Sequence, residues 1–146
     1  AIVEYIITKH GQGRLAIGPE RPDYADYLFW LHYANGNFQP NMSRNMYLRR
    51  LNLPTENPLL TRLGRRLDAA YAMIDKRLGE VPFLAGDELT AADIMTVFSL
   101  TTMRYFIPYD LSPYPNVLAY LQRIAGRESY QRAMRKGDPG MPLLLT

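Results

Sequence analysis

The chain has 146 residues, of which 47% are hydrophobic and 21% charged, and its net charge is +3. This composition is typical of a globular domain with a substantial core, and it excludes a disordered chain. The absence of cysteine excludes disulfides, thiolate metal sites and a cysteine nucleophile, and it favours a cytoplasmic protein.

Several classes of partner are not indicated by the sequence. No apolar run approaches the roughly 20 residues of a membrane span, and the first residues lack the basic segment of a signal peptide. The mild basicity comes without a recognition-helix motif and without aromatic residues interleaved with the arginines. We therefore expect neither a membrane nor a nucleic acid as partner.

Residues 1–22 contain one short element and a connector. Ile2, Val3, Ile6 and Ile7 recur at helical spacing, although their β-branched side chains leave a strand as the rival interpretation. A helix over residues 1–10 lacks an N-cap residue of its own, so we expect it to be the remnant last helix of a preceding domain. Glycine and proline in residues 11–22 predict a linker.

Two helical segments follow over residues 23–79. The first has Asp23 as its expected cap and ends before Pro54, with a bend or break near residues 37–40 because of Gly36 and Pro40. The second begins after Asn57, with proline at its first position. Its apolar residues form one stripe, and four basic residues lie off that stripe: Arg62, Arg65, Arg66 and Lys76.

The segment after residue 86 predicts the central helix of the fold, over residues 91–106. Thr90 and Asp93 have the spacing of a capping box, in which threonine and carboxylate satisfy each other's backbone N–H groups. Leu89 and Ile94 are placed as a hydrophobic staple. We assign Thr90 and Asp93 a structural role, and we expect the almost uncharged helix to be buried on most sides.

The remaining residues predict a helix opened by Pro115 and ended at Gly126, a shorter helix over residues 128–136, and an irregular tail over residues 137–146. No strand alternation appears after the first ten residues. The predicted fold is all-α, with a helical domain over residues 23–136.

Three segments resemble the C-terminal domain of cytosolic glutathione S-transferases. They are residues 83–94 (FLAGDELTAADI), residues 30–40 (WLHYANGNFQP) and residues 114–127 (YPNVLAYLQRIAGR). The resemblance covers about residues 1–136 and is strongest to fungal and bacterial members. It implies an all-α bundle that conjugates glutathione, as cosubstrate, to small electrophiles or reduces peroxides with it.

Full members of the family also have a thioredoxin-like domain, which binds glutathione and supplies the residue that activates its thiol. Residues 1–10 resemble the last helix of that domain, so we expect it to be missing and place no catalytic residue in this chain. Neither histidine has metal-ligand spacing.

The resemblance implies that the first helix and the core helix form the wall of the acceptor-substrate pocket. Tyr33, Asn37 and Asn41 follow at i, i+4 spacing and should share a face. Adaptable apolar surface would come from Phe38 and Met42, with Met103 and Tyr105 facing them from the core helix. The alternative is that these aromatic and methionine side chains belong to the core.

Members of this family form homodimers, and the arginine-rich faces at residues 44–50 and 62–66 suit a partly polar interface between subunits. The same arginines could instead contact a carboxylate of glutathione or water. A second function remains open, because helical domains of this type also serve as non-catalytic protein-interaction modules.

Overall fold

The computed structural model describes all 146 residues and contains helices without a β-sheet. The elements are α1 (Ile2–His10), α2 (Tyr24–Tyr33), the π-helical turn η1 (Ala34–Phe38), α3 (Gln39–Arg49), α4 (Pro58–Glu80), α5 (Ala91–Leu100), the 3₁₀ turn η2 (Thr102–Tyr105), α6 (Pro115–Ala125) and α7 (Glu128–Gly137). The predicted all-α fold is confirmed.

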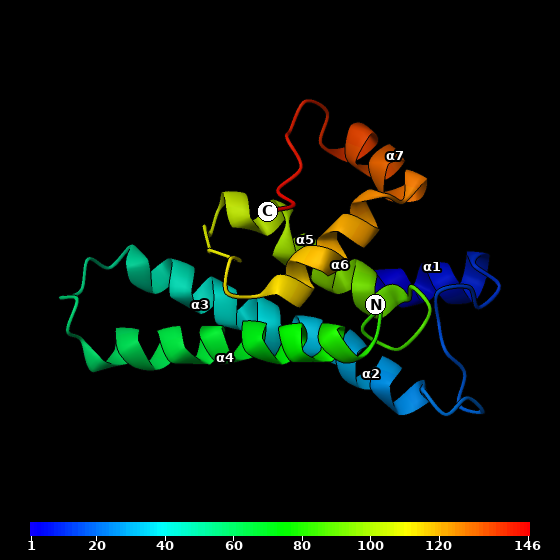
Figure 1. Ribbon diagram of the computed structural model, residues 1–146, viewed down its shortest axis with the longest axis horizontal. Helices are drawn as coiled ribbons and strands as arrows, with labels where there is room; N and C mark the ends of the chain where they lie inside the picture. Colours follow the sequence, from blue (N-terminus) through cyan, green and yellow to red (C-terminus); the bar gives the residue numbers. More distant parts are fainter.

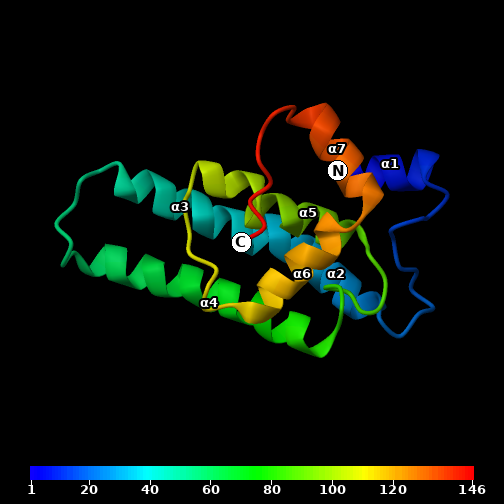
Figure 2. The ribbon, with the colours of Figure 1, turned by 45° about the horizontal axis from the view of Figure 1, so that its top comes forward.

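The helices pack around one core, and one long hairpin projects from it. α5 packs on α2, while α4 contacts α3 on one side and α6 on the other. Figures 1 and 2 show α3 and α4 side by side as the hairpin, with α1 and α7 near the opposite end of the molecule. None of the helices has the length and apolar content needed to cross a bilayer.

The stripe predicted on α4 forms the centre of this core. Tyr71 and Ile74 have no exposed surface, and Leu67, Ala70 and Leu78 are also buried. The helix begins as the sequence predicts, because the Asn57 side chain accepts a hydrogen bond from the Leu59 N–H at 2.9 Å. The basic residues off the stripe are exposed.

The carboxylate of Asp93 is fully buried at the start of α5 and holds three parts of the chain together. Both halves of the predicted capping box with Thr90 are present. The Thr90 N–H donates to Asp93 Oδ2 at 2.8 Å, and the Leu84 N–H donates to Oδ1 at 2.9 Å. The hydroxyl of Tyr120 on α6 donates to Oδ1 at 3.0 Å. Asp93 therefore joins α5, the preceding loop and α6.

The central helix is shorter than the sequence predicts, but it is buried on most sides as expected. It ends at Leu100 rather than near residue 106, because Thr101 leaves the helical region with φ −123° and ψ −96°. The hydroxyl of Thr101 donates to the Val97 carbonyl at 2.7 Å and satisfies it. Ile94 and Phe98 are 43% and 49% exposed, so one face of α5 has no cover within this chain.

The helix does not break near residues 37–40, and the irregularity predicted there takes the form of a π-helical turn over residues 34–38. Pro40 has no N–H to donate to the carbonyl four residues earlier, and its ring would clash with that carbonyl in an α-helix. A wider turn immediately before it avoids the clash. The Gln39 N–H bonds to the Ala34 carbonyl, and α2, η1 and α3 follow one another without an interruption.

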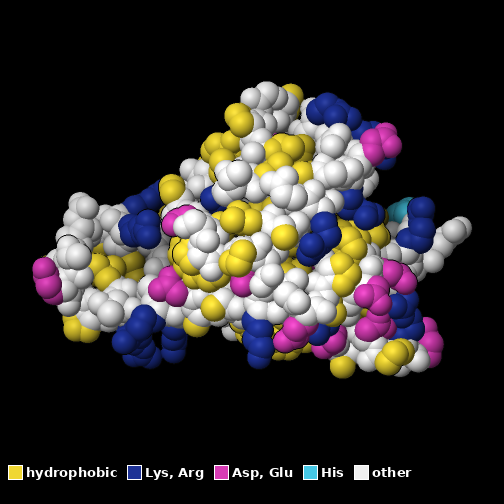
Figure 3. All heavy atoms as spheres, viewed as in Figure 1, with side chains coloured by type: hydrophobic (Ala, Val, Ile, Leu, Met, Phe, Trp, Pro, Cys, Tyr) yellow, Lys and Arg dark blue, Asp and Glu magenta, His cyan; other side chains and the backbone are white.

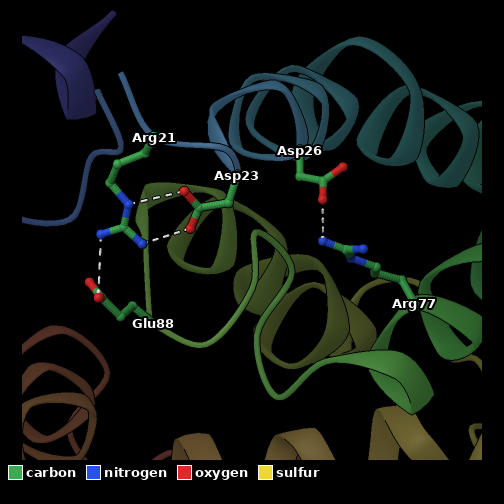
Figure 4. A network of polar contacts seen from close by, with 5 residues as sticks. All are labelled: Arg21, Asp23, Asp26, Arg77 and Glu88. Carbon is green, nitrogen blue, oxygen red and sulfur yellow. Dashed lines mark hydrogen bonds and ion pairs between the residues drawn. The ribbon is translucent and has the colours of Figure 1, made fainter. Parts of the chain in front are cut away.

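Asp23 occupies the N-cap position of α2 but does not cap it. Its carboxylate accepts two hydrogen bonds from Arg21, at 2.7 and 3.0 Å, and Arg21 also pairs with Glu88 in the loop before α5 (Figure 4). Arg77 near the end of α4 pairs with Asp26 at 2.7 Å in the same region. These contacts join the start of α2 to two segments distant in the sequence.

The two ends of the chain differ in how they are held. Residues 2–10 are helical rather than extended, and Ile7 is their only buried residue. The irregular tail returns over the bundle, where Arg104 donates to the Thr146 carbonyl at 2.8 Å and Gln122 to the Leu145 carbonyl at 3.2 Å. The tail therefore packs on η2 and α6.

Replacing the carboxylate of Asp93 should destabilise the fold more than the loss of one cap. Asp93→Ala leaves buried N–H and hydroxyl donors of Leu84, Thr90 and Tyr120 without an acceptor, and each such group costs on the order of 1–3 kcal/mol. We expect the free energy of unfolding, measured by urea denaturation, to fall by about 2–4 kcal/mol.

Asp87→Ala is the matched control, because Asp87 is exposed and makes no hydrogen bond. It should change the free energy of unfolding by less than about 0.5 kcal/mol. Equal urea midpoints for the two variants would contradict a central role for the buried carboxylate.

Candidate functional site

A hollow of about 470 Å³ lies between the α2–η1–α3 segment and α4. Its lining residues come from both sides: Tyr33, Gly36, Asn37, Asn41 and Arg44 from the first, and Arg66, Ala69, Ala70 and Met73 from the second. The i, i+4 spacing of Tyr33, Asn37 and Asn41 thus brings them to one face, as the sequence predicts. Their use in binding a substrate stays a prediction.

The polar side chains along the hollow are linked to one another. Asn41 Nδ2 donates to Asn37 Oδ1 at 2.8 Å, and Arg44 Nη1 donates to Asn41 Oδ1 at 3.3 Å. Asn45 holds the same turn by donating to the Asn41 carbonyl at 2.9 Å and to the Leu63 carbonyl on α4 at 3.3 Å. These bonds fix the side of the hollow formed by α3.

The hollow is positively charged. Arg44 and Arg66 lie in its lining, which contains no carboxylate, and neither arginine forms an ion pair. A guanidinium group keeps its charge at all physiological pH values. Two uncompensated cations therefore face the same space.

Tyr33 is the one titratable phenol in this lining. Burial raises the pKa of its hydroxyl above the ordinary value, because ionisation would place a negative charge in a poorly solvated position. Its ring stacks on Phe29 at a centroid distance of 5.6 Å. At neutral pH the hydroxyl is therefore protonated, and it can donate a hydrogen bond but cannot act as a base.

Two of the predicted pocket residues face the core instead. Phe38 and Met42 have no exposed surface, so neither offers a ligand any contact in this structure. Phe38 packs edge-on against Tyr71 at 5.0 Å, and the Tyr71 hydroxyl lies 3.9 Å from Met42 Sδ. The π turn positions Phe38 toward α4, and this placement favours the alternative of a core role.

Met103 and Tyr105 also lie outside the hollow. Met103 is half-buried and packs against the core, while the Tyr105 hydroxyl donates to the Pro142 carbonyl in the tail. Both belong to η2, which begins after α5 has ended, so the core helix does not present them to Phe38 and Met42 as predicted.

The sequence did not indicate the α4 side of the hollow. Arg66, Ala70 and Met73 are spaced i, i+4 and i, i+3 along one edge of the core stripe. This spacing could have indicated that they share one helix face. The sequence places Arg44 and Arg66 on basic faces whose partner could be a second subunit, a carboxylate of glutathione or water, and it does not bring the two together. Which helix they would face depends on the hairpin geometry, which residue spacing does not specify.

Comparison with known proteins finds one matching family model and several similar proteins. Residues 57–123 match the family described as glutathione S-transferase, C-terminal domain. Glutathione S-transferase GstB of Escherichia coli K12 is 25% identical over 138 residues, spanning 92% of this chain and 64% of that protein. Disulfide-bond oxidoreductase YfcG of the same strain is 28% identical over 143 residues, spanning 96% of this chain and 63% of that protein.

A solved structure shows the same fold. A glutathione S-transferase from Actinobacillus pleuropneumoniae superposes with a TM-score of 0.79 at 20% sequence identity, covering 94% of this chain and 61% of that one. The chain spans less than two thirds of the length of each of these three proteins.

Proposed function

We propose that this chain forms the acceptor-substrate wall of a glutathione-transferring site, from the premise that residues 57–123 match the glutathione S-transferase C-terminal domain family. In such a reaction the glutathione thiolate forms a bond to an electrophilic carbon, and the leaving group departs with its bonding electrons. Reduction of a peroxide by the same thiolate is the second reaction of this type. The observation that carries the proposal is the hollow lined by Tyr33, Asn37 and Asn41 in this domain.

Activation of the thiol is proposed to come from a thioredoxin-like domain that works together with this one. Lowering the pKa of a thiol requires a nearby hydrogen-bond donor or positive charge. The hollow has no base, because Tyr33 is protonated at neutral pH and neither His10 nor His32 lines it. Glutathione is therefore proposed as a cosubstrate that is bound mainly outside this chain.

Uncovered apolar surface supports a second domain as the neighbour of α1 and α5. Ile2, Tyr5 and Ile6 on α1 are 77%, 56% and 52% exposed, and Ile94 and Phe98 on α5 are also exposed. Ile94 and Phe98 line a mostly apolar cavity of about 410 Å³ between α5 and α7. Contiguous apolar surface of this kind is usually covered by a partner.

The alternative function is a non-catalytic protein-interaction module, and the same exposed apolar residues are compatible with it. The two functions differ in whether the protein turns over glutathione. We also propose a cytoplasmic location, for which the absence of cysteine is the supporting observation.

The enzyme proposal predicts a specific pattern in the kinetics of the full-length protein. Tyr33→Phe and Asn37→Ala should raise the KM for an aryl halide acceptor several-fold, because each removes a contact in the hollow. The KM for glutathione should stay unchanged. The measurement is steady-state conjugation with each substrate varied in turn.

Asn35→Ala is the control, since Asn35 lies on the same π turn, is exposed and does not line the hollow. It should have the kinetics of the unmodified protein. A full-length protein that neither binds glutathione in calorimetry nor consumes it with any acceptor would favour the interaction module.

We further propose that the full-length protein is a homodimer and that the outer surface of the α3–α4 hairpin contributes to the contact. Residues 39–66 contain six arginines and one carboxylate, Glu56, although the whole chain has a net charge of only +3. Arg49, Arg50, Arg62 and Arg65 are exposed, form no ion pair and do not line the hollow. Figure 3 shows basic side chains gathered over this end of the molecule.

Analytical ultracentrifugation tests the dimer. Full-length protein should sediment as a dimer at micromolar concentration, and the double substitution Arg49→Glu and Arg62→Glu should shift it toward monomer, because it reverses the charge that a partner must complement. Arg135→Glu on the exposed side of α7 is the matched control. A monomeric wild-type protein at the same concentration would contradict the proposal.

A further inference from the structure

We propose that the hollow between α3 and α4 binds small organic anions, in which a carboxylate is joined to an apolar body. The inference rests on the proposed function only for the claim that such a molecule is the acceptor substrate. The binding itself is argued from the charges and surfaces of the hollow.

The first argument is the imbalance of charge. Arg44 on α3 and Arg66 on α4 line the hollow, and no carboxylate lies among its nine lining residues. Arg66 makes no hydrogen bond or ion pair, so all of its N–H groups are available to a bound anion. A carboxylate placed between two guanidinium groups would receive charge-assisted hydrogen bonds from both helices.

The second argument is how Arg44 is held. Its one hydrogen bond goes to Oδ1 of Asn41, a neutral acceptor whose residue is only 9% exposed. Asn41 is in turn fixed by its bond to Asn37 at 2.8 Å. This arrangement orients the guanidinium toward the hollow without neutralising its charge, so its remaining N–H groups are available to an anion.

The third argument is the apolar part of the lining. Ala69, Ala70, Met73 and the ring of Tyr33 form the surface beside the arginines. A volume of about 470 Å³ lies within the range of small-molecule sites. An inorganic anion would leave this surface in contact with water, whereas an aromatic or aliphatic carboxylate would cover it.

Two aryl chlorides that differ in one group provide the test. 4-Chloro-3-nitrobenzoate has a carboxylate, and 4-chloro-3-nitrobenzamide has a neutral amide of similar shape. Binding of each to the full-length protein is measured by calorimetry at low ionic strength, for the unmodified protein and for Arg44→Gln, Arg66→Gln and Arg135→Gln. Arg135 is the matched control, because it is exposed on α7, does not line the hollow and lies outside the proposed dimer contact.

The benzoate should bind at least about 10-fold more tightly than the benzamide, as expected for a hydrogen-bonded charge pair. Arg66→Gln and Arg44→Gln should each remove most of that difference, while Arg135→Gln should leave it unchanged. Equal affinity for the two compounds overturns the inference. It is also overturned if Arg135→Gln weakens benzoate binding as much as Arg66→Gln does, because the effect would then come from general surface charge.

Two further measurements separate this inference from the proposed function. Selective benzoate binding without any conjugation to glutathione would support the anion site and contradict the transferase proposal. If both compounds are conjugated to glutathione at rates that Arg44→Gln and Arg66→Gln leave unchanged, the result supports the transferase proposal and overturns the anion site. The inference is wrong if Arg66→Gln dissociates the dimer in ultracentrifugation and the unmodified protein does not bind the benzoate. In that case the arginines contact a second copy of the chain. Unchanged thermal unfolding of each variant excludes misfolding as the cause.

Discussion

The buried carboxylate of Asp93 determines how the rest of this domain is assembled. A charge without exposed surface is tolerated only where hydrogen bonds replace its hydration. Here the N–H groups of Leu84 and Thr90 and the hydroxyl of Tyr120 supply them. Burial raises the pKa of Asp93, and these hydrogen bonds oppose the shift by stabilising the ionised form. The direction of α5 and the position of α6 are thereby fixed by one group.

Because α5 is fixed at its N-terminus, α2 has a surface against which to pack, and the long hairpin of α3 and α4 extends from that base. The hollow lies within this hairpin rather than between the central helices. Its shape therefore depends on two helices in mutual contact, and its charge depends on arginines that neither helix neutralises. The domain therefore combines a region held together by hydrogen bonds to Asp93 with a more exposed, positively charged hairpin.

The elements that the sequence predicts correctly are those determined by local chemistry. Asn57 and Thr90 cap their helices because side chain and backbone lie within three residues of one another. The stripe through Tyr71 and Ile74 is read directly from helical periodicity. The i, i+4 spacing likewise places Asn37 and Asn41 on one face. These predictions required no knowledge of what packs against the helix.

The predictions that failed depend on geometry across the chain. Phe38 and Met42 were expected in a pocket, but the π turn directs them to Tyr71 on another helix. The early end of α5 at Leu100 depends on one residue, Thr101, leaving helical geometry. Arg44 and Arg66 were recognised as basic surface, yet only the pairing of α3 with α4 brings them to the same hollow. Sequence spacing within one helix contains no information about such pairings.

The π turn also affects how this domain can diversify. It contains one residue more than an α-helical turn would need over the same rise, and each residue of an α-helix corresponds to a rotation of roughly 100°. Loss of a single residue between Ala34 and Phe38 would therefore be absorbed as the wide turn closes to an α-helical one, and α3 would keep the rotation that brings Asn41 and Arg44 to the hollow. The turn thus allows the chain length to change by one residue here without exchanging the side chains that face α4.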